Sequence, residues 1–256
     1  MINLENVLSR YPERLRGFRE NILKEYLQYK ILDIIYKSPY GDRLVFLGGT
    51  AIRIVHQGIR FSEDIDFDNR GLSEEDFKSV AALVKRELEL DGYAVDLKNV
   101  FKGAYHCYVR FPGILFEHGL PGHKQERILI RIDAEPQEYD YQEEKFLLNA
   151  FGIFRYINTV PVSLLLSQKI AACLERKRAK GRDFFDVVFL AAGTGPDYGY
   201  LIQRLGIADK TQLVAALKER ASQLNLESLA GEVEPFLFDA SQKDRVALFS
   251  DWLQRF

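Results

Sequence analysis

The sequence predicts an α+β fold, in which a mixed β-sheet flanked by helices is followed by an all-helical C-terminal domain. Residues 44–47 form a compact apolar run typical of a buried strand, and residues 61–68 alternate between apolar and polar side chains. Beyond about residue 150, strand patterns give way to segments with helical periodicity. We therefore expect two domains, residues 1–150 and 151–256, with the boundary between residues 150 and 160.

The elements of the first domain follow from local patterns in chain order. Apolar residues recur at the helical period over residues 15–37, which predicts a long amphipathic helix. Gly48-Gly49-Thr50 then links the strand at 44–47 to a short helix, and the alternating strand at 61–68 follows. Ser73 is a good N-cap for a helix that ends near Leu90. Further strands are expected at 93–101, 104–112 and 126–133.

The second domain reads as a series of helices. Pro161 suits the start of the first one, because proline is tolerated where a helix begins. The other periodic segments cover residues 182–192, 197–205, 211–224 and 241–254.

Composition excludes several classes of protein. The 256 residues carry 35 Lys and Arg against 37 Asp and Glu, so any nucleic-acid partner must be bound by a local basic patch. The two cysteines, Cys107 and Cys173, are too few for a disulfide framework. No apolar run approaches the ~20 residues of a membrane span, so we expect a soluble, cytoplasmic protein without a membrane partner.

The strongest chemical signal is the pair Asp64 and Asp66. Residues two apart on a strand point to the same face, and Ile65 and Phe67 direct the other face into a core. Two carboxylates side by side repel each other and resist burial. They face water, basic side chains or a hard divalent cation such as Mg²⁺ or Mn²⁺. The alternative is a solvated strand face at a sheet edge.

A glycine-rich turn precedes this strand. The turn Gly48-Gly49-Thr50 lies between a strand and a helix, where a ligand can approach the backbone closely and where a helix N-terminus favours phosphate. It matches neither a Walker A loop nor a dinucleotide-binding fingerprint. The alternative is an ordinary tight turn.

Asp133 supplies a third carboxylate at the end of the strand 126–133. Metal-dependent phosphoryl transfer commonly uses several acidic groups to hold two cations. With Asp64 and Asp66 it forms a candidate metal-binding and catalytic trio, although a lone aspartate at a strand end is also a common turn residue.

Three runs together, LGGTAIR, RFSEDIDF and RID, resemble polymerase-β-like nucleotidyltransferases, and in particular the AbiEii/AbiGii toxins of bacterial type IV toxin–antitoxin and abortive-infection systems. The run KIAACLERKRAKGRDFFDVVFL is similar to that family's second signature. The resemblance spans roughly residues 44 to 190. It implies a nucleotidyltransferase fold, a cognate antitoxin, often a winged-helix repressor, and transfer of NMP from an NTP to RNA, in some relatives to the 3′ end of tRNA.

The second signature adds charged residues from the helical region. Lys169 and Arg176 are seven residues apart and share a helix face, while Asp183 and Asp186 lie near the start of the next helix. The resemblance implies that Lys169 and Asp183 belong to the catalytic site and that Lys169 reaches the triphosphate. The alternative for the two acids is helix capping with ion pairs to Arg176 or Arg178.

Further candidates for nucleotide binding flank the acidic pair. Ser62 shares the face of the aspartates, where it binds a phosphate, is itself modified to switch the enzyme off, or is an ordinary polar residue. Arg53 and Arg60 either bind phosphate or are solvated. The basic run at 177–182 contacts an RNA backbone or is simply a charged helix end.

The resulting hypothesis is a Mg²⁺- or Mn²⁺-dependent nucleotidyltransferase toxin. Asp64, Asp66 and Asp133 bind metal, while Gly48, Gly49, Thr50, Arg53, Ser62 and Lys169 hold the NTP. Two alternatives stay open: transfer of NMP to a protein hydroxyl, and a non-catalytic module that binds nucleotide or RNA. The sequence decides neither the preferred base nor the oligomeric state.

Overall fold

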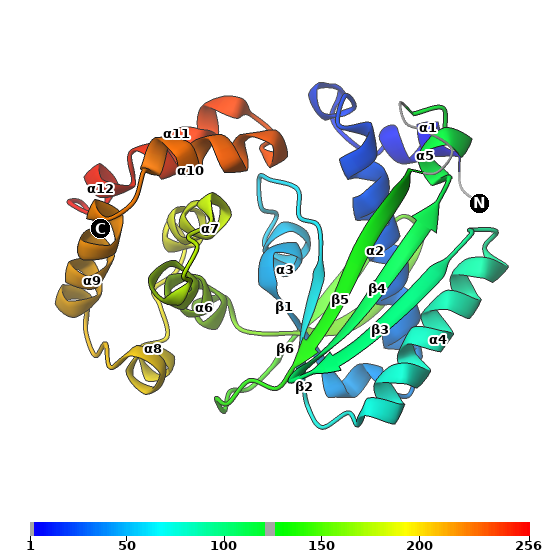
Figure 1. Ribbon diagram of the computed structural model, residues 1–256, viewed down its shortest axis with the longest axis horizontal. Helices are drawn as coiled ribbons and strands as arrows, with labels where there is room; N and C mark the ends of the chain where they lie inside the picture. The colour runs from blue at the N-terminus through cyan, green and yellow to red at the C-terminus, as the bar shows by residue number, and fades with distance from the viewer. Residues whose placement is uncertain (1–2, 121–125) are drawn as a thin grey trace. The chain divides into compact units, whose positions relative to one another are not determined.

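The computed structural model describes residues 3–120 and 126–256 and separates into two units (Figure 1). The first unit comprises Met1–Val55 and Phe61–Thr159, and the second comprises His56–Arg60 and Val160–Phe256. The sheet therefore belongs wholly to the first unit, whereas the helices after residue 160 form the second.

The first unit is built on one mixed sheet, which within the described residues has seven strands in the order β3-β4-β5-β2-β1-β7-β6. Two neighbouring pairs run parallel, β2 with β5 and β1 with β7, and the other pairs run antiparallel. The strands are β1 (Leu44–Leu47), β2 (Ile65–Asn69), β3 (Asp96–Lys102), β4 (Ala104–Pro112), β5 (Arg127–Glu135), β6 (Glu144–Ala150) and β7 (Ile153–Thr159).

Two long helices of this unit, α2 (Arg19–Lys37) and α4 (Glu74–Leu90), lie along one face of the sheet (Figure 1). They contribute buried apolar side chains such as Ile31, Phe77 and Val84 to the core. The shorter helices are α1 (Leu4–Leu8), α3 (Gly48–Val55), α5 (Ile114–Glu117) and the 3₁₀ turns η1 (Glu13–Leu15) and η2 (Gly41–Arg43).

Strands β4 and β5 have two faces of different character. Cys107, Val109 and Phe111 of β4 are completely buried, as are the alternating isoleucines of β5, Ile128, Ile130 and Ile132, to within 1% exposure. The residues between them are partly or fully exposed. Because successive side chains on a strand point to opposite faces, the face away from the core is open to solvent.

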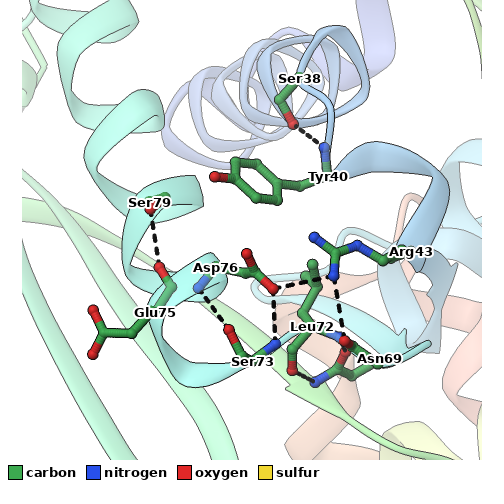
Figure 2. Close-up of polar contacts among 10 residues, drawn as sticks. Ser38, Tyr40, Arg43, Asn69, Leu72, Ser73, Glu75, Asp76 and Ser79 are labelled. Atoms are coloured by element: carbon green, nitrogen blue, oxygen red, sulfur yellow. Dashed lines mark hydrogen bonds and ion pairs between the residues drawn. The ribbon is translucent and has the colours of Figure 1, made fainter.

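The start of α4 is fixed by a capping box, as the sequence predicts. The Ser73 hydroxyl accepts a hydrogen bond from the Asp76 backbone N–H, and the Asp76 carboxylate accepts one from the Ser73 backbone N–H (Figure 2). Arg43 pairs with the same carboxylate at 3.1 Å. This end of β2 is therefore held firmly, because the Asn69 side-chain amide donates to the Leu72 carbonyl and accepts from the Leu72 backbone N–H.

In the second unit, α6 and α7 pack together, and Phe184 of α7 meets the ring of Phe249 at 5.0 Å. Gly181 begins α7 against the backbone of α10, because a Cβ there would lie 1.9 Å from the Leu229 carbonyl oxygen. The helices are α6 (Val162–Glu175), α7 (Gly181–Ala191), α8 (Tyr198–Leu205), α9 (Lys210–Ser222), α10 (Leu226–Val233), α11 (Asp244–Ala247) and α12 (Phe249–Trp252), with 3₁₀ turns η3 (Glu234–Phe236) and η4 (Ala240–Lys243).

Several elements differ from the sequence prediction. The alternating segment 61–68 becomes a strand only from Ile65, so Asp64 lies just before β2. The hairpin of β6 and β7 was not predicted at all. The expected helix at 241–254 is broken into η4, α11 and α12. No helix among the described residues is long and apolar enough to cross a membrane.

Candidate active site

The parallel pairing of β2 with β5 brings two of the three predicted acids together. Asp66 and Asp133 are register partners in this pair. Directly opposed residues on neighbouring strands have Cβ atoms about 5 Å apart and point to the same face. Asp64 precedes β2 by one residue and stays partly exposed. The acidic trio, meaning Asp64, Asp66 and Asp133, therefore gathers at one place on the open face of the sheet.

Arg131 supplies positive charge to this trio, and sequence reasoning missed it. Its guanidinium lies 3.1 Å from Asp64 Oδ2 and 2.8 Å from Asp133 Oδ2. Burial by itself lowers the pKa of Arg131, but the nearby carboxylates raise it by more, so the arginine stays charged. The signal was present in the run RID, because residues two apart on a strand share a face.

His106 of β4 was also missed as part of the site. It is the register partner of Asp133 on the other side of β5, and its Nδ1 lies 2.7 Å from Asp133 Oδ1. Asp133 is thus held from two sides, by a ring nitrogen and by a guanidinium. Such contacts fix the orientation of a carboxylate that must act as a ligand or a base.

Gly48 adjoins Asp66 so closely that a side chain there would displace the Asp66 carboxylate. A Cβ at Gly48 would lie 2.2 Å from Asp66 Oδ2, and its backbone has φ +81°. Positive φ is tolerated by glycine without strain. The glycine therefore leaves space for the Asp66 carboxylate, which is a more specific reason for it than an ordinary tight turn. Its neighbour Gly49 is half-buried within the first turn of α3.

Thr50 is completely buried, and its hydroxyl donates a hydrogen bond to the backbone carbonyl of Asp64. The bond ties the first turn of α3 to the segment that carries the acidic pair. In this structure the hydroxyl bonds to the protein's own backbone, and its effect there is to position Asp64.

Arg53 and Ser62 lie near the trio in sequence but have local partners here. The Arg53 guanidinium forms a two-pronged contact with Glu25, at 2.8 and 2.9 Å. The Ser62 side chain is partly exposed, and its carbonyl accepts a hydrogen bond from Gln28. The alternative that Arg53 is solvated is wrong, because only 17% of its side chain is exposed.

The charged residues of the second signature join Arg60 in an ion cluster of the second unit. The cluster is made of Arg60, Lys169, Arg176, Asp183 and Asp186 and is largely buried except for Arg176. Lys169 Nζ lies 3.0 Å from Asp183 and 2.9 Å from Asp186. Arg176 pairs with Asp183 at 3.1 Å. Arg60, which is also buried rather than solvated, pairs with Asp186 at 2.6 Å. The structure thus gives Asp183 the predicted ion pair with Arg176.

Electrostatics stabilise the charged forms within this cluster. Burial raises the pKa of Asp186, but Arg60 and Lys169 lower it by more, so the net shift is downward. Burial likewise lowers the pKa of Lys169, and the two aspartates reverse that effect. A role for Lys169 and Asp183 in nucleotide binding stays a prediction from the resemblance.

The acidic trio fits a divalent cation in its chemistry. Carboxylate oxygens are the ligands that Mg²⁺ and Mn²⁺ prefer. As they stand, however, no three or more His, Cys, Asp or Glu side chains among residues 3–120 and 126–256 are arranged to hold a metal ion. Arg131 is one reason why the trio is not arranged around a metal position, because its guanidinium pairs with two of the three carboxylates.

Comparison with known proteins identifies the family of the chain. Residues 30–253 match the family described as "Nucleotidyl transferase AbiEii toxin, Type IV TA system". The chain belongs to this family of nucleotidyltransferase toxins. The second signature and the trio therefore lie within one family match that covers most of the chain, and the AbiEii resemblance seen in the sequence is confirmed.

Solved structures agree on the fold. The protein JHP933 from Helicobacter pylori superposes with a TM-score of 0.53 at 16% identity, over 92% of each chain. An H. pylori protein described as a candidate nucleotidyltransferase gives 0.54 at 16% identity, over 92% of this chain and 95% of its own. No curated protein matches the sequence. The predicted fold class, a mixed sheet with a helical C-terminal region, is confirmed.

Proposed function

We propose that this AbiEii family member transfers NMP from an NTP to an RNA acceptor, the 3′ end of tRNA, with a divalent cation, Mg²⁺ or Mn²⁺, at the acidic trio. The observation that carries the proposal is the pairing of Asp66 with Asp133 beside Gly48. A toxin acting on tRNA works in the cytoplasm, and its activity is restrained by a cognate antitoxin, for which a winged-helix repressor is the expected type.

In this proposal Asp64, Asp66 and Asp133 hold the cation, which when bound polarises the phosphate oxygens and offsets their negative charge. Because the same carboxylates pair with Arg131 in this structure, the guanidinium gives way when the cation binds. Gly48 and Gly49 let the triphosphate approach the first turn of α3, and Arg53, Ser62 and Lys169 are the further nucleotide-binding candidates.

The reaction is an in-line displacement. The acceptor hydroxyl oxygen forms a bond to the α-phosphorus, while the bond from that phosphorus to the oxygen bridging to the β-phosphate breaks and pyrophosphate leaves. Asp133 accepts the proton that the hydroxyl loses, and His106 keeps this carboxylate oriented toward the acceptor. Most of the rate enhancement comes from positioning and from charge stabilisation.

The direct test incubates the purified chain with each of the four α-³²P-labelled NTPs, Mg²⁺ and total tRNA. Transfer of label to tRNA is expected with at least one NTP, and Asp66→Asn and Asp64→Ala should both abolish it. A matched control, Asp91→Asn, removes an exposed acid outside the trio that pairs with Lys30, and should transfer label normally.

Two outcomes contradict the proposal. Label that enters a protein in a lysate but never RNA supports transfer to a protein hydroxyl instead. Absence of transfer to either acceptor, together with RNA binding that does not need Asp66, supports a non-catalytic binding module.

A further inference from the structure

The open face of β3, β4 and β5 carries two cations, Lys98 and Arg110, that the proposed chemistry at the acidic trio does not use. Pairing of the three strands places Lys98, Tyr108 and Arg131 side by side across the sheet. Arg110 follows Tyr108 on the same face of β4, with its guanidinium 5.9 Å from the centre of the Tyr108 ring. We call Lys98, Tyr108, Arg110 and Arg131 the basic row.

The basic row is continuous with the site. Two residues along the strands, the neighbouring row on this face contains His106, Asp133 and Asp66. Rows on one face of a sheet are ~7 Å apart, since alternate residues rise by two steps of ~3.3 Å. The trio thus borders a surface rich in positive charge, although the whole chain carries a formal charge of −2.

The outer cations of this row form no ion pair with the described residues, although Asp96 is the register partner of Arg110 in the β3–β4 pair. Among the described residues, no carboxylate forms an ion pair with Lys98 or Arg110, whereas Arg131 is paired with the trio. Lys98 is exposed, and Tyr108 and Arg110 are partly exposed. Cations outside any ion pair beside a partly exposed aromatic ring suit phosphates and bases of a single-stranded nucleic acid, because the cations neutralise the backbone and the ring stacks.

The basic row lies on the side of Asp66 opposite the glycine turn, so an acceptor on the row and a nucleotide at the turn would approach from opposite sides. The glycine turn follows β1, on one side of Asp66, while β4 and β3 lie on the other side beyond β5. Lys98 is three strands from Asp66, or ~14 Å at a strand spacing of ~4.8 Å. In-line displacement requires the attacking and leaving oxygens on opposite sides of the phosphorus. With pyrophosphate leaving toward the turn at β1, the acceptor approaches from β4 and β3.

From this arrangement we infer that the basic row of β3, β4 and β5 binds the RNA strand that leads to the acceptor hydroxyl. Lys98 and Arg110 contact its phosphates, and Tyr108 stacks against one of its bases. The inference rests on the proposed function and extends it by assigning the surface that binds the acceptor.

The test measures RNA binding without catalysis. A 5′-fluorescein single-stranded RNA is titrated with the full-length chain in EDTA, without NTP, and its anisotropy is followed at several salt concentrations. The double variant Lys98→Ala/Arg110→Ala should bind about tenfold more weakly at low salt. Its slope of log affinity against log salt should fall by roughly 1.4, because each lost contact with a single strand contributes ~0.7.

Further variants separate stacking from charge and the sheet from other basic surfaces. Tyr108→Phe should bind as the wild type does, while Tyr108→Ala should lose affinity several-fold. Lys145→Ala is the matched control, because Lys145 is an exposed lysine on β6, the opposite edge strand of the same sheet. Lys177→Ala/Arg178→Ala tests the basic loop between α6 and α7, and neither control should weaken binding.

Equal affinity of the wild type and the Lys98→Ala/Arg110→Ala variant overturns the inference, as does a loss confined to the variant of the basic loop. So does a loss of NTP affinity in that sheet variant when RNA is absent, because the row would then bind the nucleotide. Asp66→Asn should lose label transfer but retain RNA binding. A failure of the proposed function therefore appears in the transfer assay, whereas a failure of this inference appears in the RNA-binding assay.

Discussion

Asp66 and Asp133 lie side by side on a parallel strand pair, although they are 67 positions apart in the chain. Neither acid is adjacent to the other in any local motif. The crossover through α4, β3 and β4 brings them together, and His106 and Arg131 then fix the second acid. The candidate active site of this AbiEii family member is therefore a product of sheet topology.

The close approach of Gly48 to Asp66 predicts the effect of a single methyl group. Gly48→Ala places a Cβ where Asp66 Oδ2 now lies, so the carboxylate must turn away. We expect label transfer to fall at least 100-fold, while the strain of a positive φ costs about 1 kcal/mol of unfolding free energy. Transfer assays and urea unfolding, with Gly152→Ala as a control glycine of positive φ away from the trio, measure both effects. Full transfer activity in Gly48→Ala would show that the orientation of Asp66 is unimportant.

His106 acts on the reaction through Asp133. His106→Ala should lower kcat about 10- to 100-fold, as loss of a group that orients a ligand commonly does. His106→Asn retains a nitrogen near the Nδ1 position and should recover much of kcat, whereas KM for the NTP should change little in either variant. Steady-state kinetics with tRNA in excess test this, and the idea fails if the alanine and asparagine variants lose the same activity.

Arg131 competes with a cation for the acidic trio. Arg131→Gln removes the charge that pairs with Asp64 and Asp133, so the carboxylates should attract a divalent cation more strongly. We expect Mn²⁺ to bind at least threefold tighter when measured by electron paramagnetic resonance without nucleotide. Arg155→Gln, which loses an ion pair with Asp33 outside the trio, is the control. Weaker Mn²⁺ binding by Arg131→Gln would mean that the arginine helps to build the metal site.

The buried ion cluster makes the second unit sensitive to acid. Asp186 has a pKa below its usual value because Arg60 and Lys169 outweigh the effect of burial. An acid of this kind stabilises the fold above its unfolded pKa, and the stabilisation disappears as pH falls through the lower folded value. Stability should therefore decline below about pH 4, which thermal unfolding between pH 7 and pH 3 measures.

Substitutions in the same cluster test that explanation. Asp186→Asn leaves Arg60 and Lys169 without this negative charge. It should lower the free energy of unfolding by about 3–5 kcal/mol at neutral pH, and that free energy should then fall less steeply in acid. Arg60→Met/Asp186→Leu removes the pair as a whole and should unfold at nearly the wild-type temperature, since Lys169 keeps Asp183. A steep acid decline that persists in the double variant would place the titrating group elsewhere.

The sequence predicted the parts of this structure that local patterns encode. Leu44–Leu47 is a strand, Ser73 caps α4, and that helix ends at Leu90, as expected. Period-two and period-3.6 patterns and capping residues act within a few positions of the chain. They can therefore be recognised in the sequence without knowledge of tertiary contacts.

Other features depend on contacts that no local pattern records. The hairpin of β6 and β7 was missed because Phe151-Gly152 makes its turn with Phe151 at φ 54°, where asparagine or aspartate would be the usual signal. Arg60 belongs with Asp186, 126 residues later, so its buried ion pair could not be read from neighbouring residues. His106 and Arg131 joined the site only once strand register was known.

The crossover between β2 and β5 also has a consequence for synthesis of the protein. A growing polypeptide that has left the ribosome only as far as β4 already contains Asp64 and Asp66, but lacks the strand that aligns Asp133 with them. The acidic trio can assemble only after synthesis has passed β5, about halfway along the 256 residues, and after β5 has paired with β2. A fragment that ends before Arg127 therefore lacks the strand on which the acidic trio is completed.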